Sequence, residues 1–444
     1  MKTILPNYDP KISHPFNFKI STSKESTLQA ADFLFQLLGI STGNKDHLKK
    51  RFIATLLLNL KLSLYNENMI AISLRPEFYA KQHKRYRQAI KTYDTVKKVI
   101  HAMAAHGLIQ IVRGIKQPGH DKGVQTKIAP TEKILPYLLE SALKEFTYNP
   151  PAEPIVLRTR EKPKSEIDYA ETIYIKEWRK AINSFNDLRA ESKITLNNVG
   201  LGEFNENLNF FFTNAELPAY DFSKLTTEDL SVIPLKTTYL KRVFCGDFTK
   251  GGRFYGGSEQ QLSSEMRKLI QINGEPVVEL DYSSYHLRML YHLRKRVLQG
   301  NAYASLSGGD PVWYELYKNL ALRCINCREI KKTLKSFRRY INNQKLQKMF
   351  PDLKDTTLSV YVDRLLKKHS KIKEDFFKDN GVNLQFIDSK ITNNILKHFY
   401  NKPEPVLVLP IHDSFIIAAG YKDELKEVME QEYFKVFKKY PEIK

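Results

Sequence analysis

The stretch Gly274-Glu-Pro-Val-Val-Glu-Leu-Asp281-Tyr-Ser-Ser-Tyr-His286-Leu-Arg-Met-Leu-Tyr-His292 joins an apolar strand to a helix. The strand covers Val277 to Leu280 and ends at Asp281. Shortly after it, Leu287, Leu290 and Tyr291 fall at the spacing of one helix face. The pattern therefore predicts that one carboxylate lies exposed at the lip of a sheet.

A second carboxylate occupies a similar place near the end of the chain. The apolar residues 406–411 run into His412-Asp413-Ser414 and then into the apolar residues 415–419, which predicts a hairpin of two buried strands with Asp413 at the bend. Mg²⁺ takes one or two carboxylates and fills its other positions with water and phosphate oxygens. Either Asp alone is equally well explained as a helix cap or turn residue, but the pair favours a two-metal site.

Four short motifs, in order, resemble those of the family A DNA polymerases. The run from Asp281 to Arg288 is similar to their first palm motif, Asp-Tyr-Ser-x-x-Glu-x-Arg, and His412-Asp413 to their last. Between these, Arg328, Lys332 and Tyr340 have the spacing of the fingers helix, and Gln385 opens a segment like the helix before the last palm hairpin. In addition, Asp247-x5-Arg253-x-Tyr255 resembles an element of single-subunit, phage-type RNA polymerases. The resemblance covers about residues 240–444.

The resemblance implies an antiparallel palm sheet with helical fingers and a role for each matching residue. Asp281 and Asp413 would bind two Mg²⁺ ions, with Mn²⁺ as the alternative. Arg328 and Lys332 would hold the triphosphate, and Lys332 would also protonate the leaving pyrophosphate. The implied nucleotide contacts further include Tyr282, His286 and Tyr340. The implied nucleic-acid contacts are Arg253, Tyr255, Gln385 and His412.

Each of these roles has a structural alternative that the residues leave open. Arg328, Lys332, Lys335 and Arg339 share one face of the expected helix, which is also the pattern of a solvated basic face. The glycine-rich segment around Arg253 could be a hairpin with a structural arginine. His286 stands where the DNA polymerases have Glu, and it is compatible with a packing histidine.

The choice of sugar stays open. Tyr282 after the first Asp is typical of the DNA enzymes, whereas Ser414 after His-Asp is typical of the RNA enzymes, and Tyr340 is followed by Ile341 instead of the usual Gly. We expect a DNA polymerase that extends a primer 3′-OH with dNTPs and lacks proofreading. The alternatives are a primase or RNA polymerase using NTPs, and a DNA-binding replication initiator or regulator with an inactive polymerase-like body.

Composition agrees with a protein that acts on a polyanion. Of 444 residues, Lys and Arg number 70 against 49 Asp and Glu, a formal net charge of +21. A Lys-rich proteome is the other explanation. The three cysteines cannot form a disulfide framework, and Cys324 and Cys327 have no second pair to complete a zinc site. No apolar run is long enough for a signal peptide or a membrane span, so we expect a cytoplasmic protein.

The N-terminal third resembles a winged helix-turn-helix. Residues 48–60 read as an amphipathic helix, 69–74 as a strand and 92–106 as a helix closed by Gly107, followed by a hairpin of 108–112 and 124–128. Lys97 and Lys98 on the second of these helices would contact duplex DNA, with a basic cluster upstream (Lys81, Lys84, Arg85, Arg87 and Lys91) facing phosphates. A protein-binding module is the alternative.

The expected fold is α+β, with an N-terminal winged-helix domain and then a polymerase-like palm and fingers. The expected divisions are an arm (1–25), the winged helix (26–147), a Pro-rich linker (148–165), a helical thumb-like segment (166–240) and the palm and fingers (241–444). Thr131 is expected to cap a helix over 132–146. The expected partners are primer-template and duplex DNA and nucleoside triphosphates, with no membrane and no disulfide.

Overall fold

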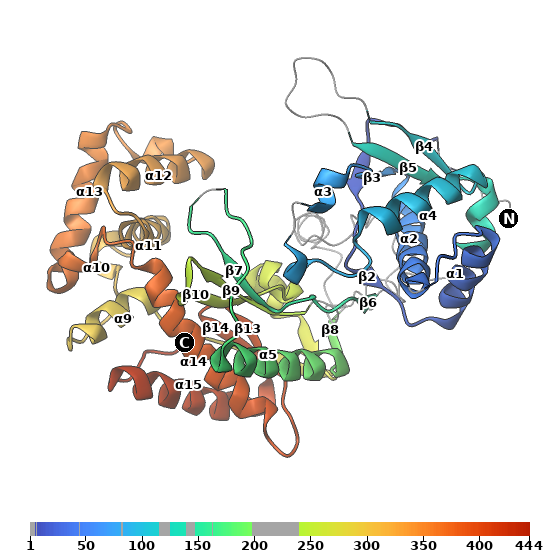
Figure 1. Cartoon of the computed structure of the whole chain (residues 1–444). Coiled ribbons are helices and arrows are strands. Elements are labelled where there is room, and N and C mark those ends of the chain that lie inside the picture. Colours follow the sequence, from blue (N-terminus) through green and yellow to red (C-terminus); the bar gives the residue numbers. More distant parts are fainter. Residues whose placement is uncertain are drawn as a thin grey trace. The chain divides into compact units, whose positions relative to one another are not determined.

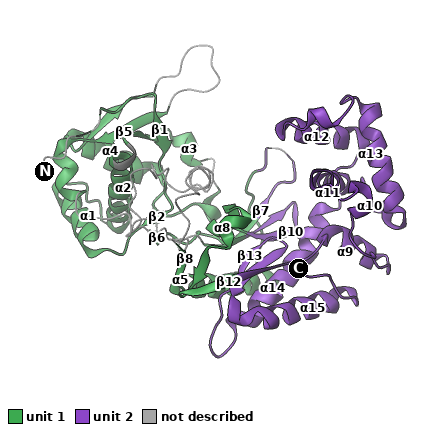
Figure 2. Ribbon diagram, turned by 180° about the vertical axis from the view of Figure 1, so that it is seen from behind, with its two compact units in different colours: residues 1–156, 165–241, 255–277 green, residues 157–164, 242–254, 278–444 purple. Residues whose placement is uncertain are grey.

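The computed structural model describes residues 5, 7–43, 45–80, 83–114, 125–138, 147–161, 163–197 and 239–444. Over these residues the chain is a mixed α+β protein that forms two compact units (Figures 1 and 2). Unit 1 comprises residues 1–156, 165–241 and 255–277, and unit 2 comprises residues 157–164, 242–254 and 278–444. The boundary expected near residue 241 is therefore only approximate, because residues 255–277 return to unit 1.

The N-terminal part of unit 1 is built around the buried helix α2 (Asp46–Asn66). Residues 52–63 of α2 are buried on every side, so this helix lies inside the core and is not the amphipathic surface helix that we expected. It packs against α1 (Glu25–Leu37) and α4 (Tyr93–Ala105). A four-stranded sheet has the order β1 (Ser13–Pro15), β3 (Met69–Ile72), β5 (Thr126–Pro130) and β4 (Ile109–Val112).

The helix and hairpin expected near residue 100 are confirmed. The Thr92 hydroxyl accepts a hydrogen bond from the Thr95 amide (3.3 Å) at the start of α4, and Gly107 follows the helix with φ +68°. Strands β4 and β5 pair antiparallel, with Ile109 opposite Pro130 and Val112 opposite Lys127. The tip of the expected wing, residues 115–124, lies outside the described residues.

Three expectations for this unit are wrong. Residues 13–21 are not a free arm, because β1 pairs with β3, and β2 (Ile20–Ser21) pairs with β6 (Thr147–Tyr148). The expected linker contains β7 (Ile155–Arg158), whose apolar residues are buried. Thr131 precedes a 3₁₀ helix, Glu132–Tyr137, instead of the start of an α-helix, and its hydroxyl donates to the carbonyls of Gly107 and Leu108. The rest of that expected helix, residues 139–146, lies outside the described residues.

The rest of unit 1 consists of short elements around one long helix. These are α3 (Pro76–Ala80), α5 (Ile173–Glu191), α8 (Ser264–Arg267), β8 (Ile194–Leu196) and β11 (Ile270–Ile272). Helix α5 confirms the helix expected in the thumb-like segment, although Ile173 at its start is exposed. Most of the remaining thumb-like segment, residues 198–238, lies outside the described residues.

The turn before β12, the strand that ends at Asp281, is a tight hairpin within unit 1. Ile272 of β11 pairs with Glu275, the first residue of β12 (Glu275–Asp281), so the loop has two residues, Asn273 and Gly274. Both have positive φ (+53° and +87°), as the Asn-Gly pair of a type I′ turn requires. This turn sets the register of β12.

Unit 2 contains the sheet strands and helices that carry the expected polymerase motifs. Beside the end of β12 lies β14 (Ser414–Ala418), which forms a hairpin with β13 (Leu409–Ile411). A smaller sheet has the order β10 (Asp247–Tyr255), β9 (Lys241–Cys245), β7. The helices are α9 (Tyr285–Leu293), α10 (Ala304–Ser307), α11 (Pro311–Asn326), α12 (Ile330–Asn343), α13 (Asp355–Lys368), α14 (Gly381–Tyr400) and α15 (Lys422–Phe437).

These helices form two groups in unit 2. Helices α10 to α13 pack on one another, and α14 lies beside α15, which also contacts β14 (Figure 1). All three cysteines are free thiols. No helix in the described part of the chain is both long and apolar enough to span a bilayer.

Gly252 allows β10 to pass close to its neighbours. Its φ is +83°, and a Cβ there would lie 2.7 Å from the Phe244 ring and 2.8 Å from Ser389 Oγ. The Gly252 carbonyl also accepts a hydrogen bond from the buried Arg242 guanidinium (3.0 Å). The next residue is Arg253, so this close approach sets where the Arg253 side chain points.

We predict that Gly252→Ala lowers the free energy of unfolding by more than about 2 kcal/mol, because the methyl group adds steric overlap to backbone strain. The matched control is Gly300→Ala. Gly300 also has positive φ (+64°), but its added Cβ would meet nothing within 4 Å, so only the strain of about 1 kcal/mol applies. Urea unfolding of both variants measures the difference. Equal losses would show that the packing around Gly252 is loose.

Candidate active site

The fold brings Asp281 and Asp413 together at the ends of two neighbouring strands. Asp281 ends β12, and the amide of the next residue, Tyr282, donates to the Asp413 carbonyl (3.1 Å). Ile411 pairs with Ser414, so His412 and Asp413 form a two-residue loop. His412 has φ +59°, a left-handed conformation that is uncommon for a non-glycine residue. The strand, helix and hairpin expected around both carboxylates are confirmed.

The surroundings of Asp281 disfavour its negative charge. Burial, followed by the nearby charge of Asp413, raises the pKa of Asp281 to about 7, and Glu279 adds to this effect. Lys318 and Lys444 act in the opposite direction but do not compensate. Two carboxylates held together with too little positive charge are suited to a divalent cation, which favours the ionised form of both.

The backbone around Asp281 is fixed on both sides. The amide and carbonyl of Asp281 exchange hydrogen bonds with Lys444 (3.0 Å each), and the Ser283 amide donates to the Glu442 carbonyl (2.8 Å). Arg288 of the first motif is buried, and its guanidinium pairs with the Glu442 carboxylate. Ser414 donates to Glu279 (2.5 Å), so the serine after His-Asp holds a third carboxylate close to Asp281. Both motifs thus also supply residues that support the backbone and the acids of the site.

A buried ion pair lies beside the two aspartates. Arg253 of β10 donates through Nε to Asp388 of α14 (2.5 Å), and through its terminal nitrogen to His286 Nε2 (3.1 Å). Burial raises the pKa of Asp388 to about 6 against the opposing effect of Arg253, and the Asp413 charge raises it further. Arg253 is therefore occupied inside unit 2, rather than extended toward a nucleic-acid strand as we expected.

His286 is neutral in this arrangement. Burial and the adjacent Arg253 charge lower its pKa to about 3. Because Nε2 accepts from Arg253, the proton is on Nδ1, and that atom has no hydrogen-bond partner among the described residues. The pKa of His412 is also lowered, by burial and by Arg253, although Asp413 opposes this. Both histidines therefore lie within the field of one arginine.

Three other residues expected to contact nucleotide or nucleic acid are Tyr282, Gln385 and Tyr255. Tyr282 is buried, its hydroxyl donates to the Met429 carbonyl (2.7 Å), and its ring stacks on Tyr285 (centroids 4.5 Å apart), so it supports the site from the core and does not face a nucleotide. Gln385 lies half-buried on α14, three residues before Asp388 and therefore on the same side of the helix. Tyr255 ends β10 and belongs to unit 1.

The fingers motif is divided between a helix and the residues before it. Lys332 and Tyr340 lie on α12, but Arg328 precedes the helix, whose N-cap is Glu329. Lys332 is exposed and pairs with Glu329 (2.6 Å). The buried residues of α12 are Thr333, Leu334, Phe337 and Ile341, so the basic side faces outward. The prediction of one helical face that includes Arg328 is therefore wrong. Lys332 and Lys335 of α12 lie on a solvated surface.

Helix α11 supplies a cation that the sequence motifs did not identify. Lys318 opposes the elevation of the pKa of both Asp281 and Tyr340, so its charge acts on residues of β12 and of α12. On the same helix, Asn319 donates to the Tyr340 hydroxyl (2.9 Å), and Arg323 lies over the Tyr340 ring (4.6 Å). Lys318 is half exposed and follows no motif, so the sequence held no signal for it. Asp388 did have one, since it interrupts the apolar series Leu384, Ile391 and Ile395 on α14.

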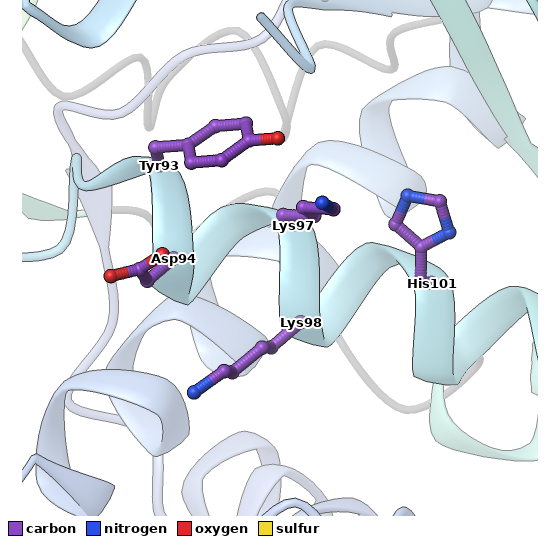
Figure 3. A pocket seen from close by; sticks show the side chains of 5 residues that line it. All are labelled: Tyr93, Asp94, Lys97, Lys98 and His101. Carbon is purple, nitrogen blue, oxygen red and sulfur yellow. The ribbon is translucent and has the colours of Figure 1, made fainter. Parts of the chain in front are cut away.

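In unit 1, Lys97 and Lys98 lie on the exposed side of α4. They line a pocket of about 290 Å³ together with Tyr93, Asp94 and His101 (Figure 3). Lys97 Nζ lies 5.3 Å from the centre of the Tyr93 ring. Lys97 shares a side of α4 with Tyr93 and His101, whereas Lys98 shares a side with Asp94. Exposed lysines of this kind are suited to phosphate contact, with Asp94 as the opposing charge.

The upstream basic cluster has a different role from the one we expected. Arg85 donates to Asp168 (2.7 Å) and Glu171 (2.6 Å), and its guanidinium lies over the Tyr169 ring (4.0 Å). Burial lowers the pKa of Lys91, whose Nζ lies 5.0 Å from the centre of the Phe78 ring. These two cations hold unit 1 together instead of facing phosphates. Lys81 lies outside the described residues.

Among the described residues, no group of three or more His, Cys, Asp or Glu side chains is placed to hold a metal ion. A site made by Asp281 and Asp413 would therefore need water or phosphate oxygens as its other ligands, which is the usual way in which Mg²⁺ is bound. No protein-family model matches this sequence, and no curated protein is detectably similar to it.

We predict that Asp281→Asn stabilises the protein at alkaline pH when metal is absent. A folded-state pKa above the unfolded value means that wild-type stability falls as pH rises from about 4 to about 7. Asn lacks this loss, so its advantage should grow through that window by at most about 1.4 kcal/mol per pH unit and stay constant above it. Urea unfolding in EDTA at several pH values measures it. A difference that does not change with pH would contradict the raised pKa.

Proposed function

We propose that this protein is a template-directed nucleotidyltransferase, best described as a DNA polymerase without proofreading. The observation that carries the proposal is the pair Asp281 and Asp413, held on adjacent strand ends by the bond from the Tyr282 amide to the Asp413 carbonyl, with the pKa of Asp281 raised to about 7. A protein gains no stability from such a pair, because its charges repel and are partly desolvated. Retaining it is expected where a bound cation and a phosphate chain supply the missing interactions.

The reaction is attack of a primer 3′-oxygen on the α-phosphorus of a nucleoside triphosphate. The new bond joins these atoms, the bond from the α-phosphorus to the bridging oxygen breaks, and pyrophosphate leaves. Mg²⁺ or Mn²⁺ held by Asp281 and Asp413 would lower the pKa of the attacking hydroxyl and offset the charge on the leaving group. Arg328 would bind the phosphate tail, and Lys332 would bind it and donate a proton to the pyrophosphate. Lys318 adds positive charge between Asp281 and Tyr340.

The second candidate is an enzyme that uses NTPs, such as a primase or RNA polymerase. It is favoured by His286, which is neutral and accepts a hydrogen bond from Arg253. By the resemblance, a family A DNA polymerase would have a carboxylate at this position, near the ribose 2′-OH. A neutral imidazole ring would exclude the 2′-OH of an NTP less strongly than a carboxylate would. The opposite argument, from Tyr282, is weaker than the sequence suggested, because that side chain is in the core.

We also propose that the N-terminal part of unit 1 binds duplex DNA. Support comes from the two lysines on the exposed side of α4, which is followed directly by the β4–β5 hairpin. Contacts of this kind would position the enzyme on its substrate without reading its sequence. If the polymerase-like body were inactive, the same surface would serve an initiator or regulator.

Primer extension tests the catalytic proposal. With Mg²⁺, we expect extension of a labelled primer-template with dNTPs, and a loss of about a thousandfold or more in Asp281→Ala and Asp413→Ala, because each removes half of the metal site. Asp423→Ala, an exposed carboxylate of unit 2 on α15, is the matched control and should extend normally. Parallel reactions with NTPs decide the sugar. Duplex binding with no extension from either nucleotide would favour the inactive-body reading.

A salt titration tests the N-terminal proposal. Replacing Lys97 and Lys98 by Gln should lower the slope of log K against log salt for duplex binding by about 1.8, since each phosphate contact contributes about 0.9. The control is the double change Lys176→Gln and Lys180→Gln, which removes the same charge from exposed positions of α5 in the same unit. An unchanged slope in the α4 variant would make this surface a protein-binding face.

A further inference from the structure

Two arginines from distant parts of the chain meet on one carboxylate of unit 2. Arg160, which follows β7, donates to Asp379 Oδ2 (2.5 Å), and Arg328 donates through Nε to the same oxygen (3.1 Å). Arg328 comes from the fingers motif, whereas Arg160 lies in the segment that the sequence suggested was a linker. Neither Arg160 nor Asp379 belongs to any motif identified in the sequence.

The charges of this group do not balance. One carboxylate faces two guanidinium groups, and the next cation, Lys332, pairs with a different carboxylate, Glu329 (2.6 Å). The arginine side chains are also accessible, with 34% of Arg160 and 64% of Arg328 exposed, while Asp379 is 24% exposed. Arginine binds phosphate through two parallel hydrogen bonds, so this pair can accept an anion with more charge than Asp379 offers.

Asp379 is held in place by an unusual backbone. Its φ is +55°, and that of Phe377 is +57°. The amides of these residues donate to the carbonyls of Cys327 (3.3 Å) and Cys324 (2.7 Å) at the end of α11, directly before Arg328. Left-handed non-glycine residues cost free energy and persist where the surrounding structure imposes them, often at ligand sites. The surrounding structure therefore imposes an unfavourable backbone conformation that places this carboxylate next to Arg328.

We propose that Arg160 and Arg328 form a phosphate-binding pair for the terminal phosphates of the nucleoside triphosphate, and that Asp379 occupies this pair until the nucleotide displaces it. The inference rests on the proposed function for the identity of its ligand and adds Arg160 to the residues that bind it. Asp379 acts as a competing internal anion, so it sets the affinity for the phosphate tail without touching the reacting atoms.

The test is calorimetric binding of inorganic tripolyphosphate to the full chain. Arg160→Gln and Arg328→Gln should each weaken binding about tenfold, because each removes charge-assisted hydrogen bonds. Asp379→Asn should tighten binding, because the arginines lose their competitor. Lys164→Gln, which removes an exposed charge from the same segment as Arg160, is the control and should leave binding unchanged.

A purely structural ion pair predicts the opposite signs. Asp379→Asn would then lower the melting temperature and weaken binding or leave it unchanged, and Arg160→Gln would bind tripolyphosphate as well as the wild type; this second result overturns the inference even if the Asp379 variant fails to fold. A short duplex used as competitor distinguishes the sources of phosphate. If duplex binding, and not tripolyphosphate binding, depends on Arg160, the inference is wrong.

The inference and the proposed function can fail separately. If primer extension depends on Asp281 but the KM for the nucleotide is the same in Arg160→Gln and wild type, the phosphate pair is wrong and the polymerase stands. If no extension occurs but tripolyphosphate binding responds to Arg160, Arg328 and Asp379 as described, the phosphate site stands and the polymerase activity does not.

Discussion

The candidate site depends on a single constraint, which is that two strand ends carrying negative charge are held side by side. The hydrogen bond from the Tyr282 amide to the Asp413 carbonyl fixes the backbones, so the side chains of Asp281 and Asp413 cannot separate to relieve their repulsion. Burial and then the charge of Asp413 raise the pKa of Asp281. Backbone hydrogen bonds to Lys444 maintain this arrangement, whereas Glu279 adds further negative charge near Asp281.

The supporting interactions divide the acids of the site into two kinds. Asp388 has its own cation in Arg253, and Glu279 has a hydroxyl donor in Ser414, so both are satisfied within the protein. Among the residues that the structure describes, no ion pair joins Asp281 or Asp413 to a cation, and Lys318 and Lys444 compensate the charge of Asp281 only partly. Of these four acids, Asp281 and Asp413 are therefore the two that the proposed metal ions would neutralise. Burial, together with the charge of Arg253, keeps His286 neutral, so β10 influences the residue expected to contact the sugar.

The sequence predicted well those features that depend on local patterns. Alternation and helical spacing located β12, α9, α4 and the hairpin around Asp413, because each is coded by consecutive residues. It failed where tertiary contacts decide. The segment 13–21 joins a sheet because Ser13 pairs with Met69, 56 residues away. Arg85 forms ion pairs with Asp168 and Glu171, which are also distant in sequence. The roles of Lys318, Arg160 and Asp379 depend on neighbours that are distant in sequence, so no spacing could reveal them.

The two-residue turn at Asn273 and Gly274 has a consequence for how this protein can change. Side chains alternate between the faces of a strand, so Glu279 and Asp281 share one face of β12, while Leu280 and Tyr282 share the other, apolar one. The turn sets this alternation by fixing where pairing with β11 begins. A one-residue insertion or deletion there would exchange the two faces, burying acids and exposing apolar residues. Length variation in this loop should therefore be purged by selection much more strongly than substitution on the outer helices.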